Sequence, residues 1–122
     1  MTLKELYDQV DGNYEQAVSV LRVEKLIDKH IRKFPKGGVV DNLLAAGATM
    51  DAVRLFETAH AMKGVCSNLG LRHLAALASD LAEEFRPGNQ RELSDEEVKE
   101  KLAEVAALYE TTKSGIAAYE AG

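Results

Sequence analysis

The stretch that decides the fold runs from residue 49 to residue 70 and reads TMDAVRLFETAHAMKGVCSNLG. Its apolar residues recur every three or four positions, which predicts a helix with one buried face. They are Leu55, Ala59, Met62, Cys66 and Leu69. We expect Thr49 to cap this helix and Gly70, in a structural role, to end it. On a helical wheel His60 lies well away from the apolar stripe, so the sequence predicts a histidine on the polar side of a central helix.

The neighbours of His60 indicate a surface prepared for another molecule. Lys63 and Gly64 follow it by three and four positions, so the three residues share one helix face. The lysine places a cation beside the imidazole. Glycine in a helix interior costs about 1 kcal/mol relative to alanine, and close approach by another molecule is one reason to accept that cost.

The pattern His60-x-x-Lys63-Gly64, followed by Asn68-x-Gly70, resembles the signature of histidine-containing phosphotransfer (HPt) domains of two-component phosphorelays. The resemblance covers most of the chain. It implies an all-α fold, an antiparallel four-helix bundle, with additional short N-terminal helices in this chain. It also implies that His60 is the phosphoacceptor, that Lys63 stabilises charge and that Gly64 gives access. The implied partners are receiver domains of hybrid histidine kinases and of response regulators.

Other residues on the His60 side receive provisional roles in partner binding. Val53 and Phe56 are expected to form an exposed apolar rim on which a receiver docks. For Phe56, burial under a neighbouring helix is an equally good prediction. Glu57 either holds the imidazole through a hydrogen bond or is an idle surface carboxylate. Ser67 leaves room or donates a hydrogen bond. Asn68 is expected to bond to the backbone of the following loop.

One position departs from the family pattern. The family often has a glutamate after the leucine that is Leu81 in this chain, but Ala82 stands there, followed by Glu83 and Glu84. This departure leaves the phosphoacceptor unaffected and puts in doubt a partner contact through that glutamate.

The rest of the chain also predicts helices. Residues 1–35 hold a capping box at Thr2–Glu5 and a second cap at Asn13. A shift of the apolar register near 21–22 indicates two consecutive helices or one bent helix, and Pro35 ends this part.

Residues 39–120 are expected to form the four-helix bundle. A short helix from Val39 closes at Gly47, the central helix follows, and a helix over 71–85 packs back on it. A capping box at Ser94–Glu97 starts a final helix of about 27 residues. The whole chain, 1–122, is read as a single HPt domain.

Composition bounds the remaining possibilities. The 122 residues are 46% hydrophobic and 29% charged, typical of one globular domain. The net charge of −5 argues against nucleic acid as a partner, and the basic residues over 22–36 are read as a solvated helix face. No apolar run is long enough to span a membrane and the N-terminus does not resemble a signal peptide, so we expect a cytoplasmic protein. The single Cys66 allows no internal disulfide.

Several functions remain open at this point. No glycine-rich nucleotide loop is present, so we expect a phosphoryl carrier without a kinase site of its own, with no cofactor and no bound metal. The alternative is a helical adaptor that binds a receiver or kinase domain without carrying phosphate. A third possibility is the detached equivalent of the phosphorylated N-terminal domain of a chemotaxis-type kinase. An ordinary surface histidine is the simplest alternative for His60. We expect a monomer.

Overall fold

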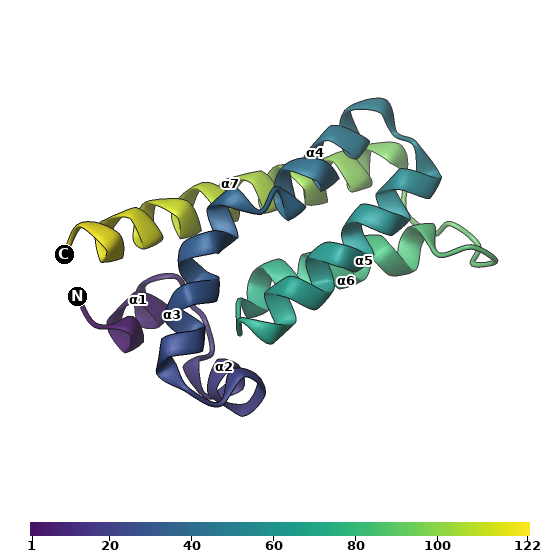
Figure 1. Ribbon diagram of the computed structural model, residues 1–122. Coiled ribbons are helices and arrows are strands. Elements are labelled where there is room, and N and C mark those ends of the chain that lie inside the picture. The colour runs from purple at the N-terminus through teal and green to yellow at the C-terminus, as the bar shows by residue number, and fades with distance from the viewer.

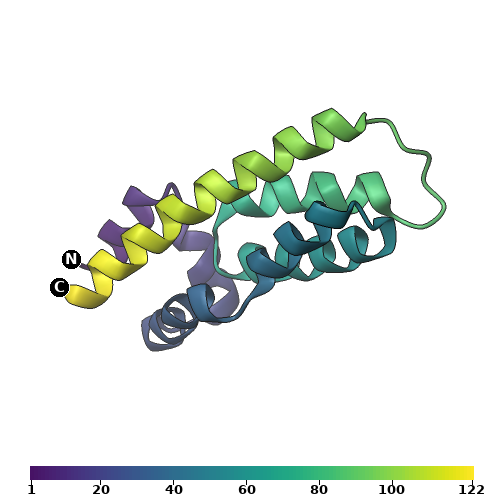
Figure 2. The same ribbon diagram turned by 90° about the horizontal axis from the view of Figure 1, so that it is seen from above.

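The computed structural model describes all 122 residues, which form seven α-helices and one short 3-10 helix, with no strands. Four of these helices run alternately up and down and form an antiparallel bundle (Figures 1 and 2). They are α4 (Val39–Thr49), α5 (Ala52–Asn68), α6 (Arg72–Phe85) and α7 (Asp95–Ala121). The predicted all-α four-helix bundle is therefore confirmed. None of the helices combines the length and the apolar character needed to cross a membrane.

The predicted apolar stripe of the central helix faces the core. Leu55, Ala59, Met62 and Cys66 are fully buried, and Leu69, the residue after the helix, is buried as well. Burial raises the pKa of the Cys66 thiol to about 12, because the thiolate would lose its hydration. The polar side of α5 is thereby turned away from the bundle axis.

The N-terminal helices lie across the end of the bundle where α5 turns into α6 (Figure 1). They are α1 (Leu3–Gln9), α2 (Tyr14–Leu21) and α3 (Glu24–Lys33), followed by the 3-10 helix η1 (Phe34–Lys36). Arg22 has a φ of 71° and separates α2 from α3, so the residues near position 22 join two helices rather than bend one. The cap predicted at Asn13 is confirmed, since its side chain accepts a hydrogen bond from the Gln16 N–H.

Two long-range hydrogen bonds join the N-terminal helices to the α5–α6 turn. The Tyr7 hydroxyl donates to the Leu69 carbonyl at 2.6 Å, and the Asn13 N–H donates to the Gly70 carbonyl at 2.7 Å. Gly70 has a φ of +70°, and a Cβ there would lie 2.1 Å from the Asn13 carbonyl oxygen. Only glycine fits this position, because a side chain would collide with backbone that cannot move independently.

Two expected helix boundaries are wrong. Thr49 does not cap α5, because it is still the last residue of α4, and the side chain of Asp51 provides the cap. Gly47 does not end α4 either; the left-handed residue that closes this helix is Met50, with a φ of 54°. Gly47 is buried, and a Cβ there would lie 2.5 Å from the Leu102 side chain. Its small size therefore serves helix packing rather than helix termination.

A buried carboxylate orders the loop between α6 and α7. Glu84 accepts hydrogen bonds from the Leu93 N–H at 2.9 Å, from the Glu92 N–H at 3.2 Å and from the Arg91 guanidinium at 3.1 Å. Burial alone would raise the pKa of Glu84, but these hydrogen bonds outweigh it and lower the pKa below its usual value. The loop therefore leads directly into the capping box of Ser94, which starts α7 as predicted.

Candidate functional site

The polar side of α5 presents His60 to solvent. His60 is exposed, and the opposite face of α5 packs into the core. Gly64, one turn further along, is also exposed, and a Cβ built there would meet no atom within 4 Å. Lys63 is half-buried beside them. The three residues singled out in the sequence thus lie together on one open stretch of a rigid helix.

An aromatic ring supports the imidazole from one turn earlier on the helix. The Phe56 ring stacks on the His60 ring, with centroids 5.7 Å apart and an interplanar angle of 23°. Phe56 is half-buried, so it is neither the fully exposed rim residue nor the fully buried core residue that the sequence left open. Val53 is 65% exposed and is available to a partner.

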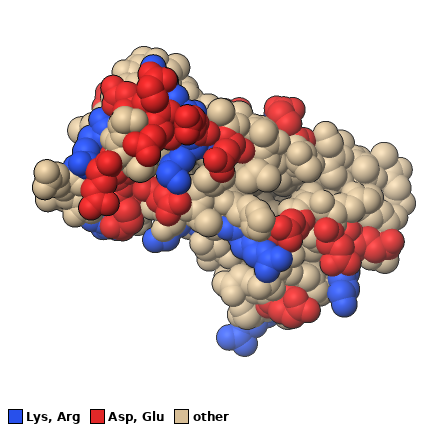
Figure 3. Space-filling model, turned by 180° about the vertical axis from the view of Figure 1, so that it is seen from behind, with Lys and Arg blue, Asp and Glu red and all other residues tan.

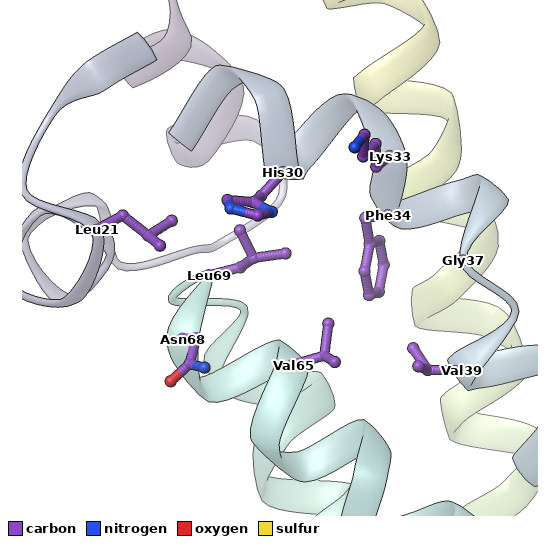
Figure 4. A pocket seen from close by; sticks show the side chains of 9 residues that line it. All are labelled: Leu21, His30, Lys33, Phe34, Gly37, Val39, Val65, Asn68 and Leu69. Atoms are coloured by element: carbon purple, nitrogen blue, oxygen red, sulfur yellow. The ribbon is translucent and has the colours of Figure 1, made fainter. Parts of the chain in front are cut away.

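The structure gives less support to two of the provisional roles. Glu57 is exposed and makes no hydrogen bond to His60. Asn68 is exposed and its side chain does not bond to the loop backbone, because the turn closes through its own backbone hydrogen bonds, such as that from the Leu71 N–H to the Cys66 carbonyl at 2.9 Å. Asn68 instead stands at the edge of a cavity (Figure 4).

That cavity has a volume of about 370 Å³ and separates α3 and η1 from the end of α5. Phe34, Val39 and Val65 point into it, with His30 above them (Figure 4). Another cavity, of about 350 Å³, is lined by Lys63 and Ser67 together with residues of α2 and α6. Ser67 is half-buried there.

Two residues that are linked to His60 through Phe56 received no role from the sequence. The guanidinium of Arg86, the residue that caps the end of α6, lies over the Phe56 ring at 5.7 Å from its centroid. Glu83 holds this guanidinium by hydrogen bonds of 3.1 and 2.5 Å. Because Arg86 donates these hydrogen bonds, the pKa of Glu83 is lowered, and attraction to Lys63 lowers it further. The spacing of Glu83 and Arg86 suggests an ion pair on one helix face, but no sequence signal places that pair against Phe56.

The charges on the surface are unevenly distributed. Acidic side chains gather over the end of the molecule where α7 begins (Figure 3), where Asp95, Glu96 and Glu97 form the first turn of the helix. Residues 22–36, in contrast, contain six Lys or Arg and two acidic residues. No group of three or more His, Cys, Asp or Glu side chains is arranged to hold a metal ion.

The chain was compared with known proteins. The Hpt domain model matches residues 37–115, which is about two thirds of the chain and includes α4, α5, α6 and most of α7. Searches of curated proteins and of solved structures found no match. The family match covers the helix that carries His60 and the three helices packed around it. The chain therefore belongs to the Hpt domain family, whose members carry phosphoryl groups in two-component signalling.

Proposed function

We propose that this protein is a phosphorelay intermediate, which accepts a phosphoryl group on His60 from an aspartate of one receiver domain and passes it to an aspartate of another. The observation that carries the proposal is the exposed imidazole of His60 beside the open position at Gly64. A receiver must bring a phosphorylated aspartate to within bonding distance of an imidazole nitrogen. The absence of a side chain at residue 64 leaves space for that approach.

The proposed transfer needs little chemistry from this chain. The lone pair of a ring nitrogen of His60 attacks phosphorus, a nitrogen–phosphorus bond forms, and the bond from phosphorus to the aspartyl oxygen breaks and releases the carboxylate. Phosphoryl transfer depends mainly on positioning and on stabilisation of charge. The stack of Phe56 on the imidazole restricts its orientation, and Lys63 provides positive charge for the phosphoryl oxygens. No nucleotide site is required, because the aspartyl phosphate is already activated.

The docking surface in this proposal surrounds His60 on α5. Val53, which is 65% exposed, and the half-buried Phe56 provide apolar contact area. Glu57 follows Phe56 on the helix, and Ser67 lies about two turns beyond His60; the two complete the surface. Gly70 acts at a distance, because it forms the tight turn that holds α5 against α6 and the N-terminal helices.

We further propose that residues 1–122 form one domain, in which the N-terminal helices in 1–35 complete the bundle in 39–120. One cluster of 27 buried apolar residues supports this, since it includes Leu6, Ile27 and Ile31 as well as the core residues of the bundle. We also propose that the protein is a monomer. It would act in the cytoplasm, where receiver domains can reach it.

The decisive experiment is phosphoryl transfer from a labelled receiver domain in the presence of magnesium, screened over the receivers of the source cell. We expect label on the wild-type protein and none on His60→Gln, a substitution of an exposed side chain that leaves the core intact. Lys63→Ala should slow the transfer while the helical content and melting temperature stay near those of the wild type.

The same experiment separates the carrier from the adaptor alternative. An adaptor would bind a receiver without acquiring label, and its binding would not depend on the imidazole of His60. Label that never reaches this protein, or that reaches His60→Gln equally well, would rule out the proposed transfer through His60.

A further inference from the structure

Glu83 is a carboxylate that binds Arg86, a cation linked to His60 through the Phe56 ring. It lies near the end of α6, and its Oε1 accepts hydrogen bonds from Nε of Arg86 at 3.1 Å and from Nη2 at 2.5 Å. The Arg86 guanidinium lies 5.7 Å from the centre of the Phe56 ring, and this ring stacks on His60. A continuous series of contacts therefore leads from Glu83 to the imidazole.

Glu83 also acts on the second cation of the site. Its pKa is lowered first by the hydrogen bonds from Arg86 and in smaller part by attraction to Lys63, so its carboxylate is charged at neutral pH. Lys63 follows His60 by three residues on the same helix face. Glu83 thus holds Arg86 by hydrogen bonds and attracts Lys63, which shares a helix face with His60.

We infer that Glu83 competes with a phosphoryl group on His60 for Arg86 and Lys63, and that this competition weakens the phosphorylated state and favours onward transfer. The inference rests on the proposed function of His60. A phosphoryl group brings up to two negative charges to the surface. Because Glu83 already neutralises part of the local positive charge and repels the new charges, the phosphorylated protein lies higher in free energy than it would without this carboxylate. Glu83 thus acts through the two cations and by direct repulsion, and it is not itself a catalytic residue.

The inference is tested with phosphoramidate, a small phosphoryl donor that needs no partner protein. The phosphorus–nitrogen bond of phosphoramidate breaks and a bond from phosphorus to a ring nitrogen of His60 forms, while ammonia leaves as ammonium with the proton that the imidazole gives up. At a fixed excess of ammonium this reaction reaches an equilibrium. Phosphorus NMR then gives the ratio of phosphorylated to free protein.

Removal of the Glu83 charge should raise this ratio. For Glu83→Gln we expect an increase of roughly two- to tenfold at low salt, which shrinks as the salt concentration rises, because a partly exposed charge is screened over about 10 Å at 0.1 M salt. Glu83→Asp, which keeps the charge, should restore a ratio near the wild-type value. Arg86→Gln should lower the ratio, since it removes a cation and leaves Glu83 without its main partner.

Asp80→Asn is the matched control. Asp80 lies one turn earlier on the same helix but pairs with Lys101 of α7 at 3.3 Å and makes no hydrogen bond to Arg86, so its substitution makes the same change of net charge without releasing that cation. We expect its ratio to rise clearly less than that of Glu83→Gln. Equal ratios for Glu83→Gln and Asp80→Asn would overturn the inference while phosphorylation of His60 still stands. Failure of the wild-type protein to become phosphorylated at His60 would instead overturn the proposed function, and the inference with it.

Discussion

Gly64→Ala is expected to stabilise the protein and to impair its proposed function. Residue 64 lies inside α5, four positions before the end of the helix, and a Cβ there would meet no atom within 4 Å. Alanine therefore gains the difference in helix propensity without a steric cost, which is about 1 kcal/mol in the free energy of unfolding. For a domain of this size, that gain raises the melting temperature by roughly 3–6 °C. Circular dichroism during thermal unfolding measures this shift.

The effect on transfer should grow with the size of the new side chain. Gly64→Gln also favours the helix, but its side chain fills the open space beside His60. A receiver then cannot bring its phosphorylated aspartate within bonding distance of the imidazole. We expect its transfer rate from a phosphorylated receiver to fall by about tenfold or more, since small displacements of reacting atoms have large effects on rate. Ala107→Gln, at an exposed position on α7, is the control that adds bulk away from α5, and it should transfer at the wild-type rate.

Two results would refute this reasoning about Gly64. A melting temperature of Gly64→Ala below that of the wild type would show that the space around residue 64 is not open in solution. A stable Gly64→Gln variant with undiminished transfer would show that access over this residue does not limit the reaction. The first result concerns the fold and the second concerns the site, so the two assays test separate steps.

Three further predictions concern the scaffold. Gly70→Ala should destabilise the protein by more than about 2 kcal/mol in thermal or urea unfolding, because its Cβ would lie 2.1 Å from the Asn13 carbonyl oxygen in a left-handed backbone conformation. The hydrogen bonds to Glu84 lower its pKa in the folded protein, so the stability that it contributes is present above its unfolded pKa and is lost as the pH falls through the lower, folded value. Glu84→Gln should lower the free energy of unfolding by about 1–3 kcal/mol at pH 7. Below pH 4.5, the free energy of unfolding of this variant should fall less steeply with pH than that of the wild type. Cys66, which is buried and has a pKa raised to about 12, should resist alkylation by iodoacetamide until the protein unfolds, and rapid labelling under native conditions would contradict its position in the core.

The local patterns of the sequence predicted the helices and the face that each one buries. The apolar stripe of α5 and the capping box of α7 each consist of residues three or four positions apart. Such spacings determine helix faces and helix starts before any tertiary contact forms. The exposure of His60 followed from the same rule, because a residue opposite a buried stripe faces solvent. These features depend on neighbours along the chain, so the sequence was sufficient for them.

The features that the sequence alone did not reveal depend on contacts between distant segments. Gly47 allows the close approach of Leu102 and does not end a helix. The neighbouring sequence is compatible with both roles, so it could not distinguish them. The contact of Arg86 with Phe56 exists only because α6 folds back along α5, which brings residues thirty positions apart together beside His60. The amino-acid sequence thus determined the helices and the helix face that His60 shares with Lys63. The approach of Arg86 to Phe56 was decided by packing, since helix packing alone determines which side chains of neighbouring helices meet.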